Sequence, residues 1–440
     1  MIKLKCKRLH FWGLGYRLKK GVTSEKDMNR LLTISAMILS YFVFAILLNS
    51  VGTVILQSIA SFEVSKPQAS VLEGYKDLSI ALVSFLVASF IPRVGYKLAL
   101  SFGLLLVTAA CLATPVIAAF WGIKLLFACI GVSFALVKVS VYALVGQLTQ
   151  SSREHSSLLN TIEGLFMVGS LTGYWLFSFY IDPVDAGRLV WLQVYYLLAG
   201  LCLIAFVTTL LIQTSSTTKP EGAAHQSFVA MLRLSYQPLV LIFILSIFLY
   251  VLIEQGIGTW LPTFNNQVLQ LPVAISVQLT SIFAASLAVG RLLAGQILKK
   301  VHWYGFLNVS LLLMAALILL ILPLAELGQG AQTASLFDAP VAAFILPLIG
   351  LLMAPIYPVL NSVMLTSLAK HQHASMTGLI VVFSALGGTT GSIITGFVFE
   401  YFGGQSAFYF SLLPMAGILL SLFGFHRISQ RSIETEGAHA

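Results

Sequence analysis

The chain has 440 residues, of which 58% are hydrophobic and only 9% are charged, and its mean hydropathy is +0.93. Soluble domains carry roughly 25% charged residues, so this composition excludes a soluble globular protein and indicates a chain that lies mainly in lipid. The net charge of +9 is interpreted as a topology signal of a membrane protein, and no nucleic-acid partner is expected.

Apolar segments long enough to cross a hydrocarbon core of ~30 Å as helices recur along the whole chain. They predict twelve transmembrane helices, over residues 31–60, 69–91, 97–119, 121–149, 156–181, 189–213, 238–263, 272–298, 302–325, 339–369, 373–401 and 405–427. The expected fold class is therefore an all-α membrane protein. The most polar internal stretch, "QTSSTTKPEGAAHQS" at 213–227, divides these helices into two sets of six.

This division predicts five regions: a basic N-terminal segment over 1–30, a six-helix half over 31–213, a linker over 214–237, a second six-helix half over 238–427 and a tail over 428–440. Nineteen of the 25 Lys and Arg residues fall in the N-terminal segment, the tail and alternate loops, whereas the opposite side carries only Lys66 and Arg188. Because cytoplasmic loops retain positive charge, both termini are predicted to be cytoplasmic, in a cell (inner) membrane.

Three pairs of glycines lie in corresponding helices of the two sets. These pairs are Gly52 with Gly258, Gly131 with Gly350, and Gly169 with Gly387. Small residues are common where membrane helices pack, so chance matches are one explanation. The alternative is a duplication of a six-helix unit in parallel, which is how major facilitator transporters are built.

The loop "ASFIPRVGYK" (88–97) resembles the signature that this superfamily carries between its second and third helices. Arg93, Gly95 and Lys97 fit the signature, and the resemblance implies that they act in gating. Ala88 and Pro92 replace the leading glycine and the acid of the signature, so the part of the gate attributed to that acid is not carried over.

Three further segments resemble the fucose:proton symporter family: "FLYVLIEQGIGTWLPTF" in the seventh predicted helix, "GLLMAPIYPVLNSV" in the tenth and "SLLNTIEGLFMVG" in the fifth. The resemblance implies proton-coupled uptake of a sugar or a related nutrient by a protein that works as a monomer. The proton-linked acid of the family's first helix falls on Gly52 here, and the acid of its fourth helix has no counterpart, with Lys138 nearby instead.

Charged residues inside the predicted helices are the strongest candidates for a site. Glu73, Lys76 and Asp77 follow the i, i+3, i+4 spacing, which places them on one face of the second helix. A charge at the bilayer centre costs at least ~2.5–3.5 kcal/mol, so this face is expected to point into the helix bundle. Lys138, Glu163 and Glu254 lie within the fourth, fifth and seventh helices. Lys124 and Arg291 lie near helix ends and are interpreted as snorkelling cations.

Two interpretations of these buried charges stay open. Glu73, Lys76, Asp77, Lys138, Glu163 and Glu254 form either a static network of ion pairs or a network that couples protons to transport. Buried pairs contribute little to stability, which favours a switching role. Burial favours the neutral form of a carboxyl group and a nearby Lys disfavours it, so movement of Lys138 could load or release a proton.

Candidate substrate-binding residues combine charge, amide groups and an aromatic ring. They are Asn49, Lys138, Glu163, Gln255, Tyr357 and Asn361. Pro355 and Pro358 are expected to interrupt the tenth helix, since proline removes a backbone donor.

The sequence predicts a secondary active transporter and no enzyme. The eight histidines lie in loops, tails or helix ends, and neither HExxH nor GxSxG occurs, so no catalytic residue, cofactor or metal is expected. The absence of a phosphate-binding loop excludes an ATP-driven pump within this chain. A receptor of the same fold remains an alternative. For a transporter, a sugar, an anionic or zwitterionic solute such as an organic acid or amino acid, and proton-driven export all remain open, as does sodium in place of protons.

Overall fold

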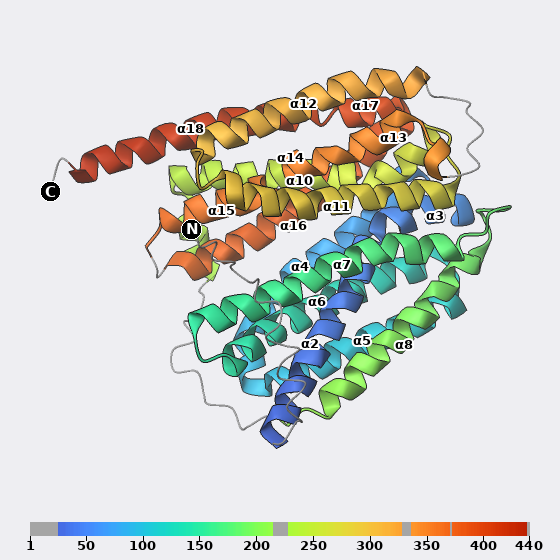
Figure 1. Ribbon diagram of the computed structural model, residues 1–440, viewed down its shortest axis with the longest axis horizontal. Coiled ribbons are helices and arrows are strands. Elements are labelled where there is room, and N and C mark those ends of the chain that lie inside the picture. Colours follow the sequence, from blue (N-terminus) through green and yellow to red (C-terminus); the bar gives the residue numbers. More distant parts are fainter. Residues whose placement is uncertain (1–24, 214–227, 328–335, 370–371, 438–440) are drawn as a thin grey trace, which may run out of the picture.

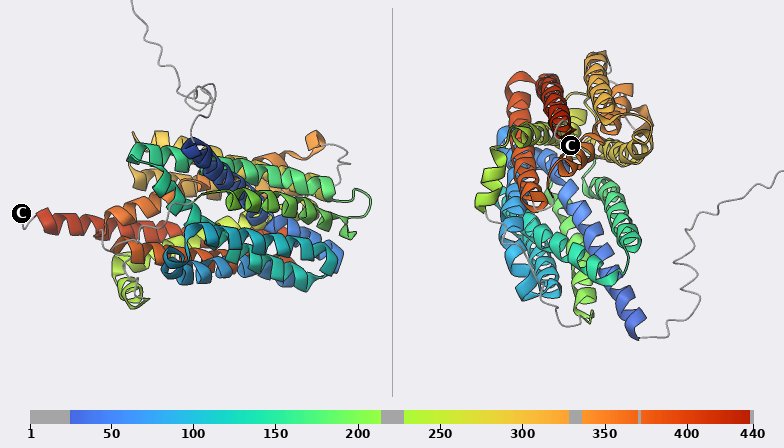
Figure 2. Two further views of the ribbon diagram at one scale, coloured as in Figure 1. Left: turned by 90° about the horizontal axis from the view of Figure 1, so that it is seen from below. Right: turned by 90° about the vertical axis from the view of Figure 1, so that its left-hand side faces the viewer.

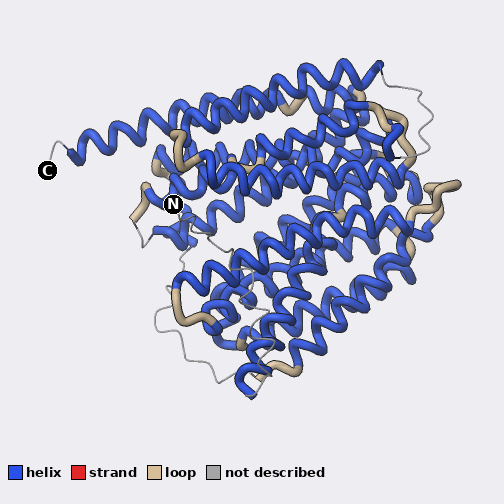
Figure 3. Tube along the Cα trace, in the orientation of Figure 1, coloured by secondary structure: helices blue, strands red, loops and turns tan. Residues whose placement is uncertain are grey.

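The protein is an assembly of long helices. The computed structural model describes residues 25–213, 228–327, 336–369 and 372–437 (Figure 1). These residues contain no β-strand (Figure 3), in agreement with the predicted all-α class. Most helices run roughly along one direction, as two further views show (Figure 2).

The first part of the chain forms one bundle. Its elements are α2 (Glu25–Asn49), α3 (Val51–Phe62), α4 (Lys66–Val94), α5 (Tyr96–Ile117), α6 (Phe120–Leu148), α7 (Ser152–Tyr180), η1 (Leu189–Gln193) and α8 (Val194–Leu210). Helix α6 packs against α4 and α5, while α2 packs against α7 and α8. This bundle occupies the lower, blue to green part of Figure 1.

The second part of the chain forms another bundle, in yellow to red. Its elements are α9 (Phe228–Ser235), α10 (Pro238–Gln267), α11 (Val273–Ile297), α12 (Trp303–Leu327), η2 (Leu336–Asp338), α13 (Val341–Ile345), η3 (Leu346–Leu348), α14 (Ile349–Met353), α15 (Ile356–Thr366), α16 (His373–Phe402), α17 (Gly404–Tyr409) and α18 (Leu412–Gly437). Helix α10 packs against α16 and α18, and α14 packs against α11 and α12.

Ten helical segments in the described part of the chain are long and apolar enough to cross a membrane. Together they identify a multi-pass membrane protein. Helices α4 and α7, which have 29 residues each, are not among the ten. At 1.5 Å per residue, each is about 44 Å long, which exceeds the ~30 Å hydrocarbon core.

Two predicted helices are interrupted in the structure. The segment predicted as one helix over 31–60 breaks at Ser50, whose hydroxyl group donates to the carbonyl of Leu47. Such a local bond competes with the helical backbone pattern. The segment predicted over 339–369 is divided into α13, η3, α14 and α15, with a break beside Pro355. The two prolines had indicated this second interruption, but nothing in the sequence analysis indicated the first.

Two region boundaries also differ from the helices observed. The predicted linker, 214–237, contains the helix α9, and the last helix, predicted to end at 427, continues as α18 to Gly437. Of the predicted basic segment over 1–30, residues 1–24 lie outside the described residues and the rest belongs to α2.

The two bundles are joined toward one end of the molecule, on the right in Figure 1. There α4 packs against α16, α7 against α11, and α3 against α10. Lys66 Nζ lies 2.9 Å from Glu400 Oε2, and the Gln278 amide donates to Ser178 Oγ at 3.1 Å. This end contains the loops that the distribution of Lys and Arg predicts to be outside the cell.

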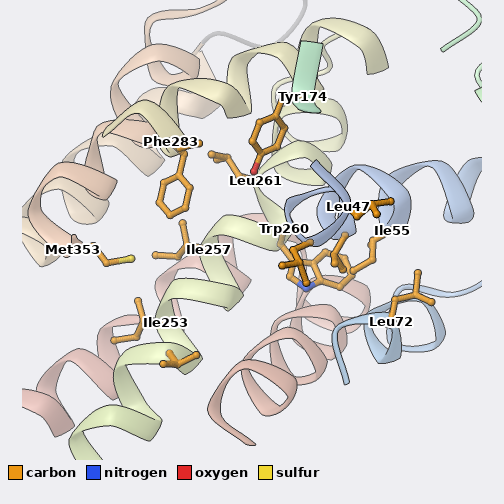
Figure 4. Packing of buried hydrophobic residues seen from close by; sticks show 14 of the residues in the cluster. Leu47, Ile55, Leu72, Tyr174, Ile253, Ile257, Trp260, Leu261, Phe283 and Met353 are labelled. Carbon is orange, nitrogen blue, oxygen red and sulfur yellow. The ribbon is translucent and has the colours of Figure 1, made fainter. Parts of the chain in front are cut away.

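Close packing continues inward from these polar contacts. Trp260 of α10 is fully buried and its Nε1 donates to the Ser392 carbonyl at 3.0 Å. Figure 4 shows its ring turned toward the helices that carry Leu47 and Ile55. A Cβ atom on Gly52 would lie 2.4 Å from the Thr259 carbonyl oxygen, so glycine is required for this approach of α3 to α10.

We predict that Gly52→Ile separates the bundles at the joined end, because the new side chain collides with the backbone of α10. Spin labels at positions 63 and 401, both exposed, should report longer distances in this variant. The matched control is Gly146→Ile, because no atom lies within 4 Å of a Cβ there. An unchanged distance distribution in Gly52→Ile would contradict the prediction.

Candidate functional site

A cavity of about 300 Å³ lies between the two bundles. Its wall is formed by α2, α3, α4, α6 and α7 of the first bundle and by α10 and α11 of the second. The charged residues in the wall are Glu73, Lys76, Lys138, Glu163, Glu254 and Arg291. Three acids and three bases therefore share one small space.

Most of the residues proposed from the sequence meet at this cavity. Those in its wall are Asn49, Glu73, Lys76, Lys138, Glu163, Glu254 and Gln255. Those outside the wall are Asp77, Tyr357, Asn361, Gly95 and Lys97. The roles of all these residues stay predictions.

The charged face of α4 forms a connected cluster where the bundles meet. Glu73 is fully buried, and its Oε1 lies 2.5 Å from Lys76 Nζ. Lys76 Nζ also lies 3.4 Å from Asp77 Oδ1, so this cation is shared between two acids. The second oxygen of Glu73 accepts a hydrogen bond from Thr259 Oγ1 of α10, at 3.1 Å. Glu73 is thus bonded to both bundles at once.

Asp77 is not part of the cavity wall and lies against the second bundle. It packs against Gly388 of α16, where a Cβ atom would lie only 2.5 Å from Asp77 Oδ2. The i, i+3, i+4 spacing correctly placed the three charges of α4 inside the protein, but it could not separate the cavity residues Glu73 and Lys76 from Asp77.

Lys138 and Glu163 face the cavity from α6 and α7. The hydroxyl of Tyr142 donates to Glu163 Oε1 at 2.9 Å. Lys138 makes no ion pair within 4 Å among the described residues; its Nζ lies 5.8 Å from the centroid of the Phe134 ring. Its side chain is exposed although it lies in the middle of α6. Lys138 is therefore free to bind an anionic group.

Glu254 lines the cavity from α10, in the second bundle. The hydroxyl of Tyr250 donates to Glu254 Oε1 at 3.1 Å. Tyr357 lies behind this pair, with its ring centroid 5.8 Å from that of Tyr250, and Asn361 Oδ1 is buried with no hydrogen-bond partner in the described structure. Tyr357 and Asn361 thus lie behind the wall rather than in it.

The two uncharged candidates in the wall differ in what they can still bind. The Asn49 amide donates to the carbonyl of Ala45 in its own helix at 2.8 Å, which leaves its Oδ1 available. Gln255 Oε1 lies 3.4 Å from Thr259 Oγ1, the same hydroxyl that contacts Glu73.

Arg291 and Thr259 are wall residues that the sequence analysis did not select. Arg291 was interpreted as a snorkelling cation because it lies near a helix end, but α11 directs it to the cavity. The adjacent Gly290 was a usable signal, since small residues mark the faces on which membrane helices pack. Thr259 carried no signal, because a threonine in a helix usually bonds its own backbone.

The predicted gating residues lie where α4 meets α5. Gly95 has φ of +101°, a conformation that favours glycine. Lys97 Nζ donates to the carbonyls of Leu210 and Ile212, at 2.9 and 2.6 Å, at the end of α8. This is the usual way in which a cation binds the unpaired carbonyls of a helix end. The side chain of Arg93 lies outside the described part of the structure.

We predict that Thr259→Val destabilises the protein by about 1–3 kcal/mol, because it leaves one oxygen of the buried Glu73 carboxylate without its donor. Valine keeps the shape of threonine, so the effect isolates the loss of the hydroxyl group, which also lies 3.4 Å from Gln255 Oε1. Thermal unfolding in detergent measures the change. Thr280→Val is the control, since the Thr280 hydroxyl bonds only a carbonyl of its own helix, at 2.9 Å. Equal losses in both variants would contradict a specific role for the Glu73 contact.

Comparisons with known proteins agree with this architecture. The model of the Major Facilitator Superfamily matches residues 35–389. A bacterial homologue of the human lysosomal transporter Spinster, inward-facing and unoccupied, is 15% identical with a TM-score of 0.68, over 92% of this chain and 97% of that chain. The nucleoside transporter NupG is 15% identical with a TM-score of 0.68, over 90% and 98%.

The fucose:proton symporter FucP of E. coli, in the outward conformation, is 15% identical with a TM-score of 0.58, over 90% of this chain and 99% of that chain. Identities this low establish likeness of fold alone. No curated protein sequence matches the chain significantly.

Proposed function

Because the chain belongs to the Major Facilitator Superfamily and is a transporter rather than an enzyme, we propose that it takes up a small polar solute by proton-coupled alternating access. The observation that carries this proposal is the placement of Glu73. This acid lies in the wall of the cavity and is bonded to both bundles. A change in its protonation therefore acts on the solute site and on the contact between the bundles together.

The hydrogen-bonding chemistry of the Glu73 carboxyl group would couple proton binding to the conformation of the protein. An ionised carboxylate only accepts hydrogen bonds, whereas the protonated group has one oxygen that donates. Protonation of Glu73 removes its ion pair with Lys76 and alters its contact with Thr259. The contact with Thr259 joins the two bundles, so proton binding and release would shift the balance between conformations.

We further propose that α4 and α7 cross the bilayer with the ten apolar segments, which gives twelve membrane helices in two halves. The charges of α4 support this, because Glu73 and Lys76 face the cavity and Asp77 faces α16 rather than lipid. The distribution of Lys and Arg supports cytoplasmic termini. With that orientation the closed end lies outside the cell, and the conformation is inward-facing. The higher TM-score with the inward-facing Spinster homologue than with outward FucP agrees with this.

Two classes of solute are supported by different observations. The resemblance to the fucose:proton symporter family, with FucP among the similar structures, supports a sugar or a related nutrient. Asn49, Gln255 and Thr259 offer uncharged hydrogen-bonding groups for such a solute. Lys138 and Arg291 line the cavity and make no ion pair within 4 Å among the described residues, which supports the anionic alternative.

We predict that Glu73→Gln abolishes accumulation driven by a pH gradient in proteoliposomes and retains exchange of solute between the two sides, because the amide keeps the shape but cannot carry the proton. Accumulation is measured as the uptake of a mixed pool of labelled sugars, amino acids and organic acids, read by mass spectrometry. Glu63→Gln is the control, as Glu63 is exposed and lies outside the cavity. Gradient-driven accumulation by Glu73→Gln at the native level would remove the basis of the coupling proposal.

The proposed orientation predicts which loops are open to the outside. In a variant without native cysteines, Asp185→Cys should react with an impermeant maleimide added to intact cells. Tyr236→Cys should react only after the membrane is opened. Both positions are exposed in the structure, so the difference reports sidedness. The reverse pattern would show that the termini lie outside.

A further inference from the structure

We propose that the solute is a small dianion, with one anionic group bound by Lys138 of the first bundle and the other by Arg291 of the second. This inference rests on the proposed transport function and narrows it to one class of substrate. It assigns Arg291 a substrate-binding role, which its position near the end of α11 did not indicate.

The three cations in the cavity wall differ in whether they have an acidic partner. Lys76 is occupied, since its Nζ lies 2.5 Å from Glu73 and 3.4 Å from Asp77. Lys138 and Arg291 make no ion pair within 4 Å in the described part of the chain. Both side chains are exposed at the cavity. Two cations are thus free to bind a ligand.

The acids Glu163 and Glu254 of the cavity wall each accept a hydrogen bond from a tyrosine. Glu163 accepts from the Tyr142 hydroxyl at 2.9 Å, and Glu254 accepts from the Tyr250 hydroxyl at 3.1 Å. Neither acid forms an ion pair within 4 Å with Lys138 or Arg291 in the described part of the chain. These two acids therefore already have hydrogen-bond donors, while Lys138 and Arg291 have no acidic partner among the described residues.

The placement of the two cations explains why the ligand has two anionic groups. Lys138 lies on α6 and Arg291 on α11, so a ligand that binds both connects the bundles. A ligand that binds more tightly when the bundles close around it shifts the protein toward that state, as alternating access requires. A cavity of about 300 Å³ is at the lower end of the range for small-molecule sites, which limits the ligand to a small one.

The two cations also discriminate against other solutes. The hydroxyl groups of a neutral sugar accept hydrogen bonds but carry no charge, so a sugar would leave both cations without a counter-charge. A monoanion would compensate one cation and leave the other unpaired. Arginine can bind a carboxylate through two parallel hydrogen bonds, so Arg291 is suited to hold the orientation of one end of the ligand.

Binding to the purified full-length protein in detergent tests this inference. The probes are the dicarboxylates succinate, glutarate and adipate, with butyrate as the monocarboxylate and fucose as the neutral solute. At least one dicarboxylate should raise the unfolding temperature at lower concentration than butyrate or fucose. Its apparent Kd should rise at least about tenfold in Arg291→Gln and in Lys138→Met, as one partner of a charged pair is lost.

Butyrate provides the internal control for folding. Because it needs only one cation, Arg291→Gln should change its binding much less than that of the dicarboxylate. Arg291→Lys keeps the charge and should retain part of the preference. Lys124→Met is the matched control, since Lys124 lies on the same helix as Lys138, over the Phe120 ring at 4.8 Å and outside the cavity wall.

Two results would overturn the inference. One is that no dicarboxylate binds more tightly than butyrate and fucose, and the other is that Arg291→Gln leaves the preference for dicarboxylate unchanged. Either result leaves proton-coupled transport standing if another solute accumulates under a pH gradient and Glu73→Gln abolishes that accumulation. If dicarboxylates bind as expected but do not accumulate under any gradient, the proposed coupling fails and the binding site stands.

Discussion

The burial of charge at the meeting of the two bundles is the constraint on which the rest of this structure depends. Glu73 lies with no exposed surface and is bonded to Lys76 of its own helix and to Thr259 of the opposite bundle. An unpaired charge in such a place would be strongly unfavourable, so the two helices are held in one register. The other cavity residues take their positions around this contact.

Close helix packing makes this contact feasible. Gly52 lets α3 approach the backbone of α10 at the level of Thr259, and Gly388 leaves room on α16 for Asp77. Bulkier residues would separate the bundles and admit lipid or water to the ion pairs. In membranes, where hydrophobic burial drives helix association weakly, packing of small residues and interhelical hydrogen bonds have this function.

The arrangement of charge in the cavity separates a fixed part from an available part. Lys76 is fully engaged between Glu73 and Asp77, while Lys138 and Arg291 have no ion partner in the described structure. The fixed part joins the bundles, and the available part lines the cavity. The proposed coupling requires that both line one small cavity, so that a change in charge at one alters the electrostatic potential at the other.

The class of the protein could be predicted from its amino-acid sequence, because hydropathy and length decide which segments can remain in lipid. It predicted an all-helical membrane transporter of the major facilitator superfamily, which the family match confirms. It also placed Glu73 and Lys76 together inside the protein, since helical periodicity fixes which residues share a face. The interruption at Pro355 followed from proline chemistry in the same local way.

Which polar and charged groups meet across the chain depends on how the helices pack in three dimensions. The contact of Glu73 with Thr259 joins residues 186 positions apart, and no local pattern encodes it. The same holds for Arg291, whose position near a helix end allowed a snorkelling interpretation until α11 was placed beside the cavity. Periodicity gives the face of a helix, but the partner of that face depends on how the two bundles pack.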